Sequence, residues 1–481
     1  MTLQLHDSAT RTTAPFRPLV DGAVSLYVCG PTTQGSPHLG HLRTFLAFDV
    51  LVRWLRRSGY DVTYVRNVTD IDDKVLAKAA EAGWPWWAWS LRFEREFHEQ
   101  LDAVGCVRPT YEPRATGHVP EMIAFMERLK GRGHAYADGE GSVYFDVSSL
   151  PDYGSLTRQS LEDLQETGEE TEPGKRAPQD FALWKAAKPE EPASASWDTP
   201  FGRGRPGWHL ECSAMAHKYL GESFDIHAGG LDLRFPHHEN EQAQSHAAGY
   251  GFARRWMHSG VLTVDGLKMG KSLDNFVTAE DALAAHPAPV VRLALVGAHY
   301  RALVEYNSRA LAEAATVWDR FTATAGRARE LLVADGRELE DPRTAQLPEA
   351  FVAALDDDLA VPEALAVIHR TQTELNALLA GGAGADPASI GSLLGQLRGM
   401  LDVLGLDPLD AQWTQEDRSA GAEHAALDAL VQAQLRARAQ ARAAKDWTAA
   451  DRIRDDLAAA GIRVEDGPDG ARWTLETTGR S

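Results

Sequence analysis

Residues 23–41 read AVSLYVCGPTTQGSPHLGH and decide the fold. The first six residues are mostly apolar and include β-branched valines, which predicts a short buried parallel strand. The glycines and prolines from Gly30 to Pro37 then predict a tight loop. Apolar residues recur at helical spacing from Leu42 to Trp54, so a helix follows. At the junction of loop and helix, unpaired N–H groups and the helix dipole create a site for an anion.

The segment that follows extends this unit into a parallel sheet. A second run rich in β-branched residues spans Val62 to Val68, and strand, helix and strand in this order form a βαβ unit. The acidic cluster Asp70, Asp72 and Asp73 comes next. It is compatible with a metal site, but carboxylates at a helix N-terminus are the commoner arrangement.

Two motifs far apart in the chain carry groups suited to phosphate. His38 and His41 stand at i and i+3 beside the predicted anion site, where imidazoles can hydrogen-bond phosphate oxygens. Lys268 and Lys271 lie in the glycine-flanked stretch GLKMGKS, residues 266–272. Taken singly, neither motif indicates a phosphate site, because histidines in loops and lysines in solvated turns are common in proteins without one.

Four further side chains form a candidate metal site: Cys29, Cys212, His237 and Glu241. We expect Cys29 at the end of the first strand and Cys212 near a strand of the second half of the sheet, in the segment WHLECSAM. The helix opening at Pro236 would present His237 and Glu241 on one face, whereas His238 and Glu239 would point elsewhere. Two thiolates, an imidazole and a carboxylate suit zinc. Spacing alone leaves the alternative open that distant cysteines are buried apolar residues.

The two motifs together resemble the paired signatures of class I aminoacyl-tRNA synthetases, here as HLGH at 38–41 and KMGKS at 268–272. The extended form CGPT at 29–32, with WHLECSAM at 208–215 and FPHHENE at 235–241, resembles the cysteine-specific family, the cysteinyl-tRNA synthetases. The resemblance implies that Cys29, Cys212, His237 and Glu241 hold one Zn²⁺ per chain.

The resemblance also implies a reaction. L-cysteine would be activated by ATP, with Mg²⁺, to an adenylate and transferred to the 3′ end of cysteine tRNA. It places Thr69, Trp208 and His227 around the bound cysteine, although Thr69 and Trp208 are equally suited to the core. A soft metal that binds the substrate thiolate would separate cysteine from serine further than the ~10–200-fold that an apolar pocket achieves.

The chain departs from the family pattern at positions that carry no metal ligand. Gly270 stands where the lysine signature usually has serine, which removes a hydroxyl. The segment Thr33-Gln34-Gly35 replaces the common Val-Tyr-Asp, and Ala228 replaces a glycine.

The composition is that of an ordinary globular protein. The 481 residues are 44% hydrophobic and 25% charged, which predicts several domains. Three cysteines favour a reducing cytoplasm over a disulfide framework. No apolar run approaches ~18 residues, so we expect no membrane span. A net charge of -20 is unfavourable for RNA, so contacts with tRNA must come from local basic surfaces.

The expected architecture is α/β: a Rossmann-like parallel-sheet catalytic domain with an inserted connective-peptide domain, then a helical bundle and a small C-terminal α/β anticodon-binding domain. The expected bounds are 1–108 and 197–307 for the catalytic halves, 109–196 for the insertion, 308–407 for the bundle and 423–481 for the C-terminal domain. In the last domain Arg452, Trp447 and Trp473 are candidates for tRNA contact, because unstacked bases favour aromatic and guanidinium partners. We expect a monomer.

Two rival functions remain. The cysteine:amino-sugar ligase of mycothiol synthesis resembles the same catalytic core, but it lacks the second glutamate of the HHENE segment and a full anticodon-binding end. Here Glu241 is present and the chain continues to Trp473. The other rival is an inactive paralogue that only binds RNA, which the intact His38, His41, Lys268 and Lys271 argue against.

Overall fold

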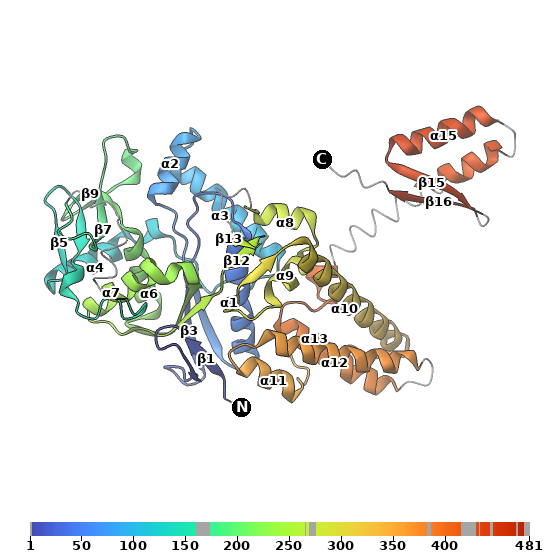
Figure 1. Ribbon diagram of the computed structural model, residues 1–481, viewed down its shortest axis with the longest axis horizontal. Coiled ribbons are helices and arrows are strands. Elements are labelled where there is room, and N and C mark those ends of the chain that lie inside the picture. The colour runs from blue at the N-terminus through green and yellow to red at the C-terminus, as the bar shows by residue number, and fades with distance from the viewer. Residues whose placement is uncertain are drawn as a thin grey trace. The chain divides into compact units, whose positions relative to one another are not determined.

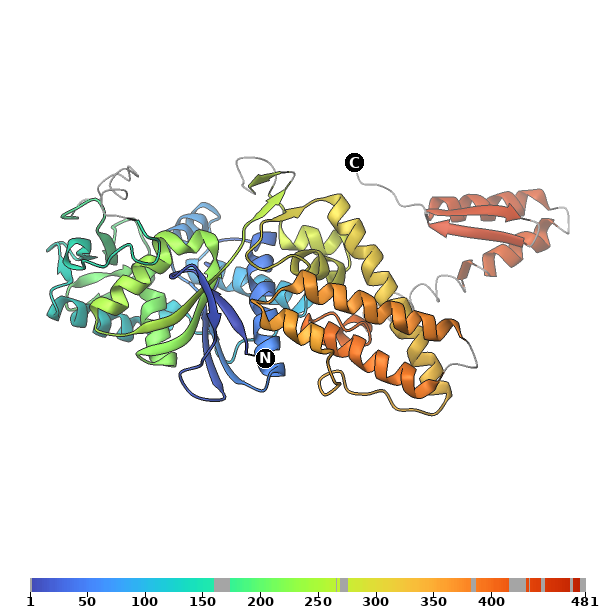
Figure 2. The same ribbon diagram turned by 60° about the horizontal axis from the view of Figure 1, so that its bottom comes forward.

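The computed structural model describes residues 2–159, 174–264, 266–268, 276–381, 386–414, 430–431, 433–442, 446–467 and 470–475. The chain divides into two units, Met1–Pro408 and Leu409–Ser481 (Figures 1 and 2). Among the described residues, no helix combines the length and the apolar character needed to cross a membrane.

The predicted βαβ unit is confirmed. Strand β3 is Ala23–Val28, helix α1 is Leu39–Arg57 and strand β4 is Asp61–Arg66. The two strands are parallel and in register, with Val28 opposite Arg66. Buried apolar residues cover much of α1, because this helix packs on the sheet and also against the helices that follow the lysine motif.

The catalytic sheet has four parallel strands in the order β11-β10-β3-β4. Strand β10 is Ser223–Gly230 and β11 is Phe252–Ser259. Val28 lies opposite Ala228, and the amide of Cys29 donates to the carbonyl of Ala228 over 2.9 Å. The segments that follow β3 and β10 therefore leave the same edge of the sheet, where open α/β sheets bind their ligands.

A long segment separates β4 from β10. Helices α2 (Asp73–Glu81) and α3 (Trp86–Ala103) come first, and α4 (Val119–Gly131) lies at the start of the expected insertion. Asp72 caps α2 through a hydrogen bond to the amide of Lys74, which agrees with the helix-terminus interpretation of the acidic cluster.

The insertion continues as a five-stranded antiparallel sheet in the order β5-β6-β7-β9-β8. Its strands are Ala135–Ala137, Val143–Phe145, Phe181–Ala186, Trp197–Thr199 (β8) and Gly202–Pro206 (β9). The expected end of the insertion at 196 falls inside this sheet, because β9 pairs with β7 and β8 pairs with β9. We therefore place that end at Pro206.

The segment that carries Cys212 is a helix, so its expected place near a resumed strand is wrong. Helix α6 runs from Trp208 to Leu220 and ends at Gly221, which has φ 85°. Seven consecutive residues of this helix, from Leu210 to Ala216, are buried. A helix that is buried on most sides shows no readable apolar stripe, which is why the sequence pattern did not reveal it.

Helix α7, Glu239–Ala247, follows a wide turn over Arg234–His238 and packs against α6. A small sheet in the order β13-β12-β14 comes next, with strands Leu267–Lys268, Leu262–Val264 and Val304–Tyr306. Helices α8 (Ala279–Ala285) and α9 (Ala288–Val296) lie between β13 and β14 in the chain. Lys271 and Gly270 lie outside the described residues.

The predicted helical bundle is present in the rest of the first unit. Its helices are α10 (Ser308–Ala334), α11 (Glu349–Asp356), α12 (Val361–Ala380) and α13 (Pro387–Val403), and the last three of these pack in succession. The N-terminal hairpin of β1 (Gln4–Asp7) and β2 (Thr12–Pro15) pairs with this region through a bridge between Gln4 and Asp357.

The second unit is a small α/β structure. Helix α15 spans Trp447–Ala459, and β15 (Ile462–Gly467) pairs antiparallel with β16 (Gly470–Leu475). Its apolar core consists of Val431, Leu435, Leu457 and Ile462. This helix and the two short strands agree with the small C-terminal α/β domain that the sequence analysis expects.

Candidate active site and metal centre

The four candidate metal ligands meet at the carboxyl edge of the catalytic sheet. One possible ligand atom from each of Cys29, Cys212, His237 and Glu241 lies within 4.8 Å of the others, and all four residues are buried. Cys29 follows β3, Cys212 comes from α6, and the other two come from the turn before α7 and from α7 itself. Three separate segments therefore converge on one point.

The spacing of these atoms fits a single tetrahedral ion. Two thiolates bound to one zinc at about 2.3 Å lie about 3.8 Å apart. The Sγ atoms of Cys29 and Cys212 are 3.8 Å apart, and Cys29 Sγ lies 3.4 Å from Glu241 Oε1. His237 Nε2 is 2.9 Å from the same oxygen, as expected of a hydrogen bond between an imidazole and a carboxylate. The donor set and the spacing of the two sulfur atoms match zinc.

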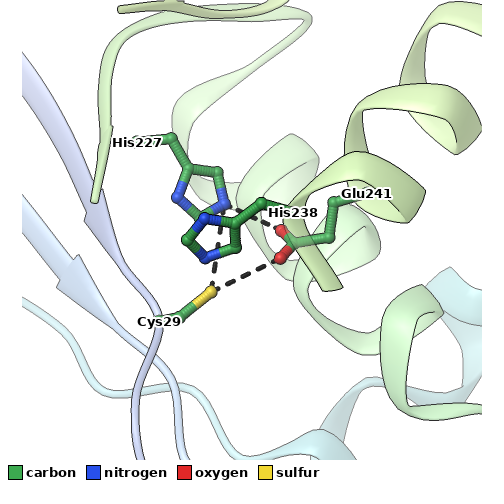
Figure 3. A group of neighbouring side chains, drawn as sticks. All are labelled: Cys29, His227, His238 and Glu241. Atoms are coloured by element: carbon green, nitrogen blue, oxygen red, sulfur yellow. Dashed lines mark hydrogen bonds and ion pairs between the residues drawn. The ribbon is translucent and has the colours of Figure 1, made fainter. Parts of the chain in front are cut away.

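A second group overlaps the first and is shown in Figure 3. It consists of Cys29, His227, His238 and Glu241, again buried and within 4.8 Å. The expectation that His238 points away on another helical face is therefore wrong. The residues just before Glu239 form a wide turn that contains the extended backbone of Phe235 (φ -137°, ψ 136°), so regular α-helical directions do not apply to them.

Electrostatics make the cluster a strong site for a cation. Burial disfavours the charge on Glu241, but His227 and His237 hold the pKa of its carboxyl well below the usual range. Burial likewise opposes the charged form of His237, yet Glu241 and then Cys212 raise its pKa to about 10. Burial also raises the pKa of the Cys29 thiol, whereas hydrogen bonds from Cys29 and His237 outweigh burial at Cys212 and lower its pKa to about 6. The thiol of Cys212 therefore loses its proton more readily than a free cysteine.

A second layer of side chains orients the His237 ring. Its Nδ1 lies 3.0 Å from Nδ1 of His209, and burial keeps the pKa of His209 well below its usual value. A neutral His209 can accept the Nδ1 proton of His237, which leaves Nε2 of His237 as the ligand atom. Trp208 stacks on the same ring, with centroids 4.1 Å apart and 14° between the planes.

The signature histidines cap helix α1, and this fixes their tautomers. Nδ1 of His38 accepts from the amide of Gly40, and Nδ1 of His41 accepts from the amide of His38, both over 3.1 Å. A nitrogen that accepts carries no proton, so each neutral ring carries its proton on Nε2. Burial, and then His38, lower the pKa of His41 to about 3. The rings stack 3.7 Å apart as a pair of N–H donors.

One cavity joins the metal cluster to these histidines. It has a volume of about 290 Å³. Its wall is formed by Cys29 and Trp208 from the metal side, by His38 and His41 from the signature, and by residues 30–32, 34, 40, 44–45, 230–233 and 259–262. A substrate that reaches Cys29 is therefore within the same space as the anion site at the start of α1.

The described residues on both sides of 269–275 are held by neighbouring elements. Lys268 ends β13, and its backbone pairs with Thr263 of β12. After the gap, Phe276 packs edge-on against His38, and Thr278 forms a bridge with the backbone of His38. The amide of Ala279 donates to the carbonyl of Pro37. The segment that begins at Phe276 is thus anchored to the start of α1.

The three residues expected around cysteine lie close to the cluster. Trp208 lines the cavity. His227 is buried, with Nε2 2.8 Å from Glu241 Oε2 and 4.0 Å from Cys29 Sγ. Thr69 is buried and donates to Glu211 Oε2 over 2.9 Å.

Several residues of this region escaped the sequence analysis. Glu211 and His258 are buried around the cluster and His209 is partly buried there, and Asn67 links Gly30 to Thr69 by two hydrogen bonds. The only signal in the sequence was their position next to quoted motifs, because the partners of a buried polar residue depend on tertiary contacts.

The tRNA candidates lie in the second unit. Trp447 is 59% exposed at the start of α15, and Arg452 is exposed on the same helix. Trp473 lies in β16, and its side chain is outside the described part of the chain.

Comparison with known proteins identifies the family. Residues 15–316 match the class I (C) tRNA synthetase catalytic domain, residues 350–408 match the DALR domain, and residues 424–473 match the cysteinyl-tRNA ligase anticodon binding domain.

Relatives are similar over the whole chain. A cysteine–tRNA ligase of Beutenbergia cavernae is 59% identical over 99% of this chain and 100% of its own. One from Streptomyces griseus is 51% identical over 99% of each chain. Among solved structures, Mycobacterium tuberculosis methionyl-tRNA synthetase in complex with methionyl-adenylate shares the fold, with a TM-score of 0.56 at 16% identity, covering 80% of this chain and 90% of that one. The chain belongs to the cysteine–tRNA ligase family of class I tRNA synthetases.

Proposed function

We propose that this chain joins L-cysteine to cysteine tRNA with ATP, and that it selects cysteine through a Zn²⁺ held by Cys29, Cys212, His237 and Glu241. The observation that carries the proposal is the double role of Cys29. This residue belongs to the metal cluster and also lines the cavity that contains His38 and His41. A cysteine whose thiol lies at the cluster would therefore direct its carboxylate into the space beside the signature.

The bound zinc would supply one function, to accept the substrate thiol as an added ligand and favour its thiolate form. The chain supplies the rest of the selection. Trp208 closes one side of the cavity while stacking on His237, so the wall next to the thiol and the metal ligand are positioned together. Serine offers a hydroxyl, which is a poorer ligand for a soft site.

The signature residues bind the nucleotide. The Nε2–H groups of His38 and His41 and the amides at the start of α1 would donate to phosphate oxygens of ATP, which arrives with Mg²⁺. Lys268 and Lys271 would neutralise the charge that develops on the leaving pyrophosphate as the cysteine carboxylate attacks the α-phosphorus. Displacement at phosphorus needs positioning and charge neutralisation more than a covalent catalyst.

The second unit would provide the tRNA contacts. Its match to an anticodon-binding domain and the exposure of Trp447 and Arg452 support this assignment. The domain bounds that we propose are the expected ones, with the insertion ending at Pro206. We further propose a monomer that acts in the cytoplasm.

The mycothiol ligase alternative is not favoured. Relatives named cysteine–tRNA ligase match the chain from end to end, and the C-terminal residues 424–473 match an anticodon-binding family. An enzyme that uses an amino sugar as acceptor has no need of that unit.

Metal analysis tests the proposal, with the third cysteine as a matched control. Purified protein should contain about one zinc per chain. Cys212→Ser should lower the zinc content and raise the KM for cysteine in ATP–pyrophosphate exchange. Cys106→Ser should change neither, because Cys106 follows α3 and packs near Asp49, Arg53 and Arg292 instead of at the cluster. Active protein without zinc would contradict the proposal.

A further inference from the structure

The second group of four side chains shares two members with the zinc cluster. From its geometry we propose that Cys29, His227, His238 and Glu241 form a second position for a divalent cation of the Zn²⁺ or Co²⁺ type, which the ion occupies in alternation with the first. The proposal rests on the proposed function, because the first position is the zinc site described above.

Both shared side chains face the two positions at once. Glu241 directs Oε1 to His237 at 2.9 Å and Oε2 to His227 at 2.8 Å. Cys29 Sγ lies 3.8 Å from Cys212 Sγ and 4.0 Å from His227 Nε2. A cation can therefore exchange Cys212 and His237 for His227 and His238 without losing the thiolate or the carboxylate.

The His238 ring has a nitrogen available for this role. Its Nδ1 lies 2.9 Å from Nε2 of His258, whereas its Nε2 is buried without a hydrogen-bond partner among the described side chains. A buried polar atom without a partner is costly. Ligating histidines commonly donate their other ring N–H to a neighbour, and His258 is placed to accept it. Figure 3 shows the His238 and His227 rings gathered over Cys29 and Glu241.

The local backbone provides the room for these rings. A Cβ atom at Gly229 would lie 2.8 Å from Cε1 of His238, so only glycine lets this imidazole approach the end of β10. Trp256 stacks on His227 at 4.5 Å with 18° between the planes, which fixes that ring against the cluster. The second position is thus built into the fold.

The chemistry of the second group suits the same class of ion. One thiolate, two imidazoles and one carboxylate are common ligands of Zn²⁺ and are accepted by Co²⁺. The two thiolates and the one carboxylate of the combined cluster supply three negative charges, fewer than the four positive charges of two dications. A second dication would therefore leave uncompensated charge in a buried site, so one ion is bound at a time. His227 then acts as a metal ligand when the ion is in the second position, in addition to its expected place beside cysteine.

Cobalt substitution tests the proposal through metal count and absorption spectrum. The band that arises from charge transfer between thiolate and Co²⁺ grows with the number of thiolates bound. Cys212→Ser/His237→Gln removes the ligands unique to the first position. His227→Gln/His238→Gln removes those unique to the second, and Cys29→Ser/Glu241→Gln removes the shared pair as the control for surface binding. Circular dichroism verifies folding.

At saturating Co²⁺ we expect His227→Gln/His238→Gln to bind about one Co²⁺ per chain with the two-thiolate spectrum, and Cys212→Ser/His237→Gln to bind about one Co²⁺ with roughly half that band intensity per ion. Wild type should bind about one Co²⁺ with a band intensity between these two. If Cys212→Ser/His237→Gln binds no more Co²⁺ than the control Cys29→Ser/Glu241→Gln, while His227→Gln/His238→Gln binds about as much as wild type, the second position is wrong. The zinc proposal for the first position then stands. If His227→Gln/His238→Gln is the protein that fails, the first ligand set is wrong. Two ions in wild type would contradict alternation.

Should a double variant misfold, milder variants decide the same question. Cys212→Ser alone should bind the ion more weakly than wild type, but at saturating Co²⁺ it should hold about one ion with a one-thiolate spectrum, and adding His238→Gln to it should remove that ion. Retention of the ion in Cys212→Ser/His238→Gln would overturn the second position.

Discussion

At the residue scale, the centre depends on a few side chains whose neighbours settle their protonation. Cys212 is favoured as a thiolate by the hydrogen bonds it receives from Cys29 and His237. The signature histidines are neutral donors because the backbone of their own helix start binds Nδ1. The types of these residues could be predicted from the motifs. Their tautomers and pKa directions could not, because these depend on burial and on contacts between distant segments.

The neutral His41 predicts a pH dependence of stability. The pKa of His41 is lowered to about 3 in the folded chain, against about 6.5 when unfolded. Between these values the unfolded state binds more protons, so this residue's contribution to stability is present above pH ~6.5 and is lost as pH falls towards ~3. The slope approaches about 1.4 kcal/mol per pH unit.

Urea unfolding at several pH values checks this expectation. His41→Gln should show a shallower loss of unfolding free energy between pH ~6.5 and ~4 than wild type. Equal slopes for the two proteins would show that His41 is not held neutral.

At the element scale, the loop after β3 is held by the segment after β4. The amide of Gly30 donates to Asn67 Oδ1 over 2.8 Å, and a Cβ atom at Gly30 would lie 1.6 Å from the Asn67 carbonyl oxygen. The sequence predicted this strand, loop and helix well, because their periodicities differ sharply. It did not predict α6, whose buried residues show no periodicity.

Substitution of Gly30 should therefore disturb the metal centre. Gly30→Ala must push the two loops apart and displace the adjacent Cys29, so the protein should lose stability by a few kcal/mol and bind less zinc. Thermal melting and metal analysis measure both. Gly35→Ala is the matched control, since its Cβ would meet only the Lys78 Nζ atom, at 3.7 Å. Normal zinc content in stable Gly30→Ala protein would contradict the close packing of the loops.

The lysine motif yields a kinetic prediction. Lys271→Ala should slow cysteine-dependent ATP–pyrophosphate exchange by about 10²–10³, the usual effect of losing one transition-state contact, and should leave the zinc content unchanged. An unchanged exchange rate would show that Lys271 has no role in catalysis and that the lysine motif is only a turn of the chain.

At the scale of the whole molecule, the residues of the proposed catalytic centre all belong to one of the two units. The ligands of the cluster, the cavity and the signature histidines all lie in Met1–Pro408. The order of domains could be read from the sequence because composition changes along the chain. The end of the insertion could not, because β8 and β9 are short and join their sheet only through pairing with β7.

Removal of the second unit should separate the two half-reactions. Protein ending at Pro408 should keep cysteine-dependent ATP–pyrophosphate exchange within about twofold, while the KM for tRNA rises by more than tenfold; loss of a few base contacts at about 1–3 kcal/mol each is sufficient. Binding of tRNA to the full chain should weaken as salt concentration rises. Equal charging efficiency with and without residues 409–481 would refute the assignment.

In the proposed function, the zinc cluster at Cys29 selects cysteine by its thiol. The most direct measurement is the ratio of kcat/KM for cysteine to that for serine in ATP–pyrophosphate exchange, for zinc-loaded wild type and for Cys212→Ser, with Cys106→Ser as control. We expect the wild-type and control ratios to exceed the ~200-fold limit of a pocket without metal, and the Cys212→Ser ratio to fall towards that limit. The same ratio in all three proteins, or a wild-type ratio below ~200, would contradict the account.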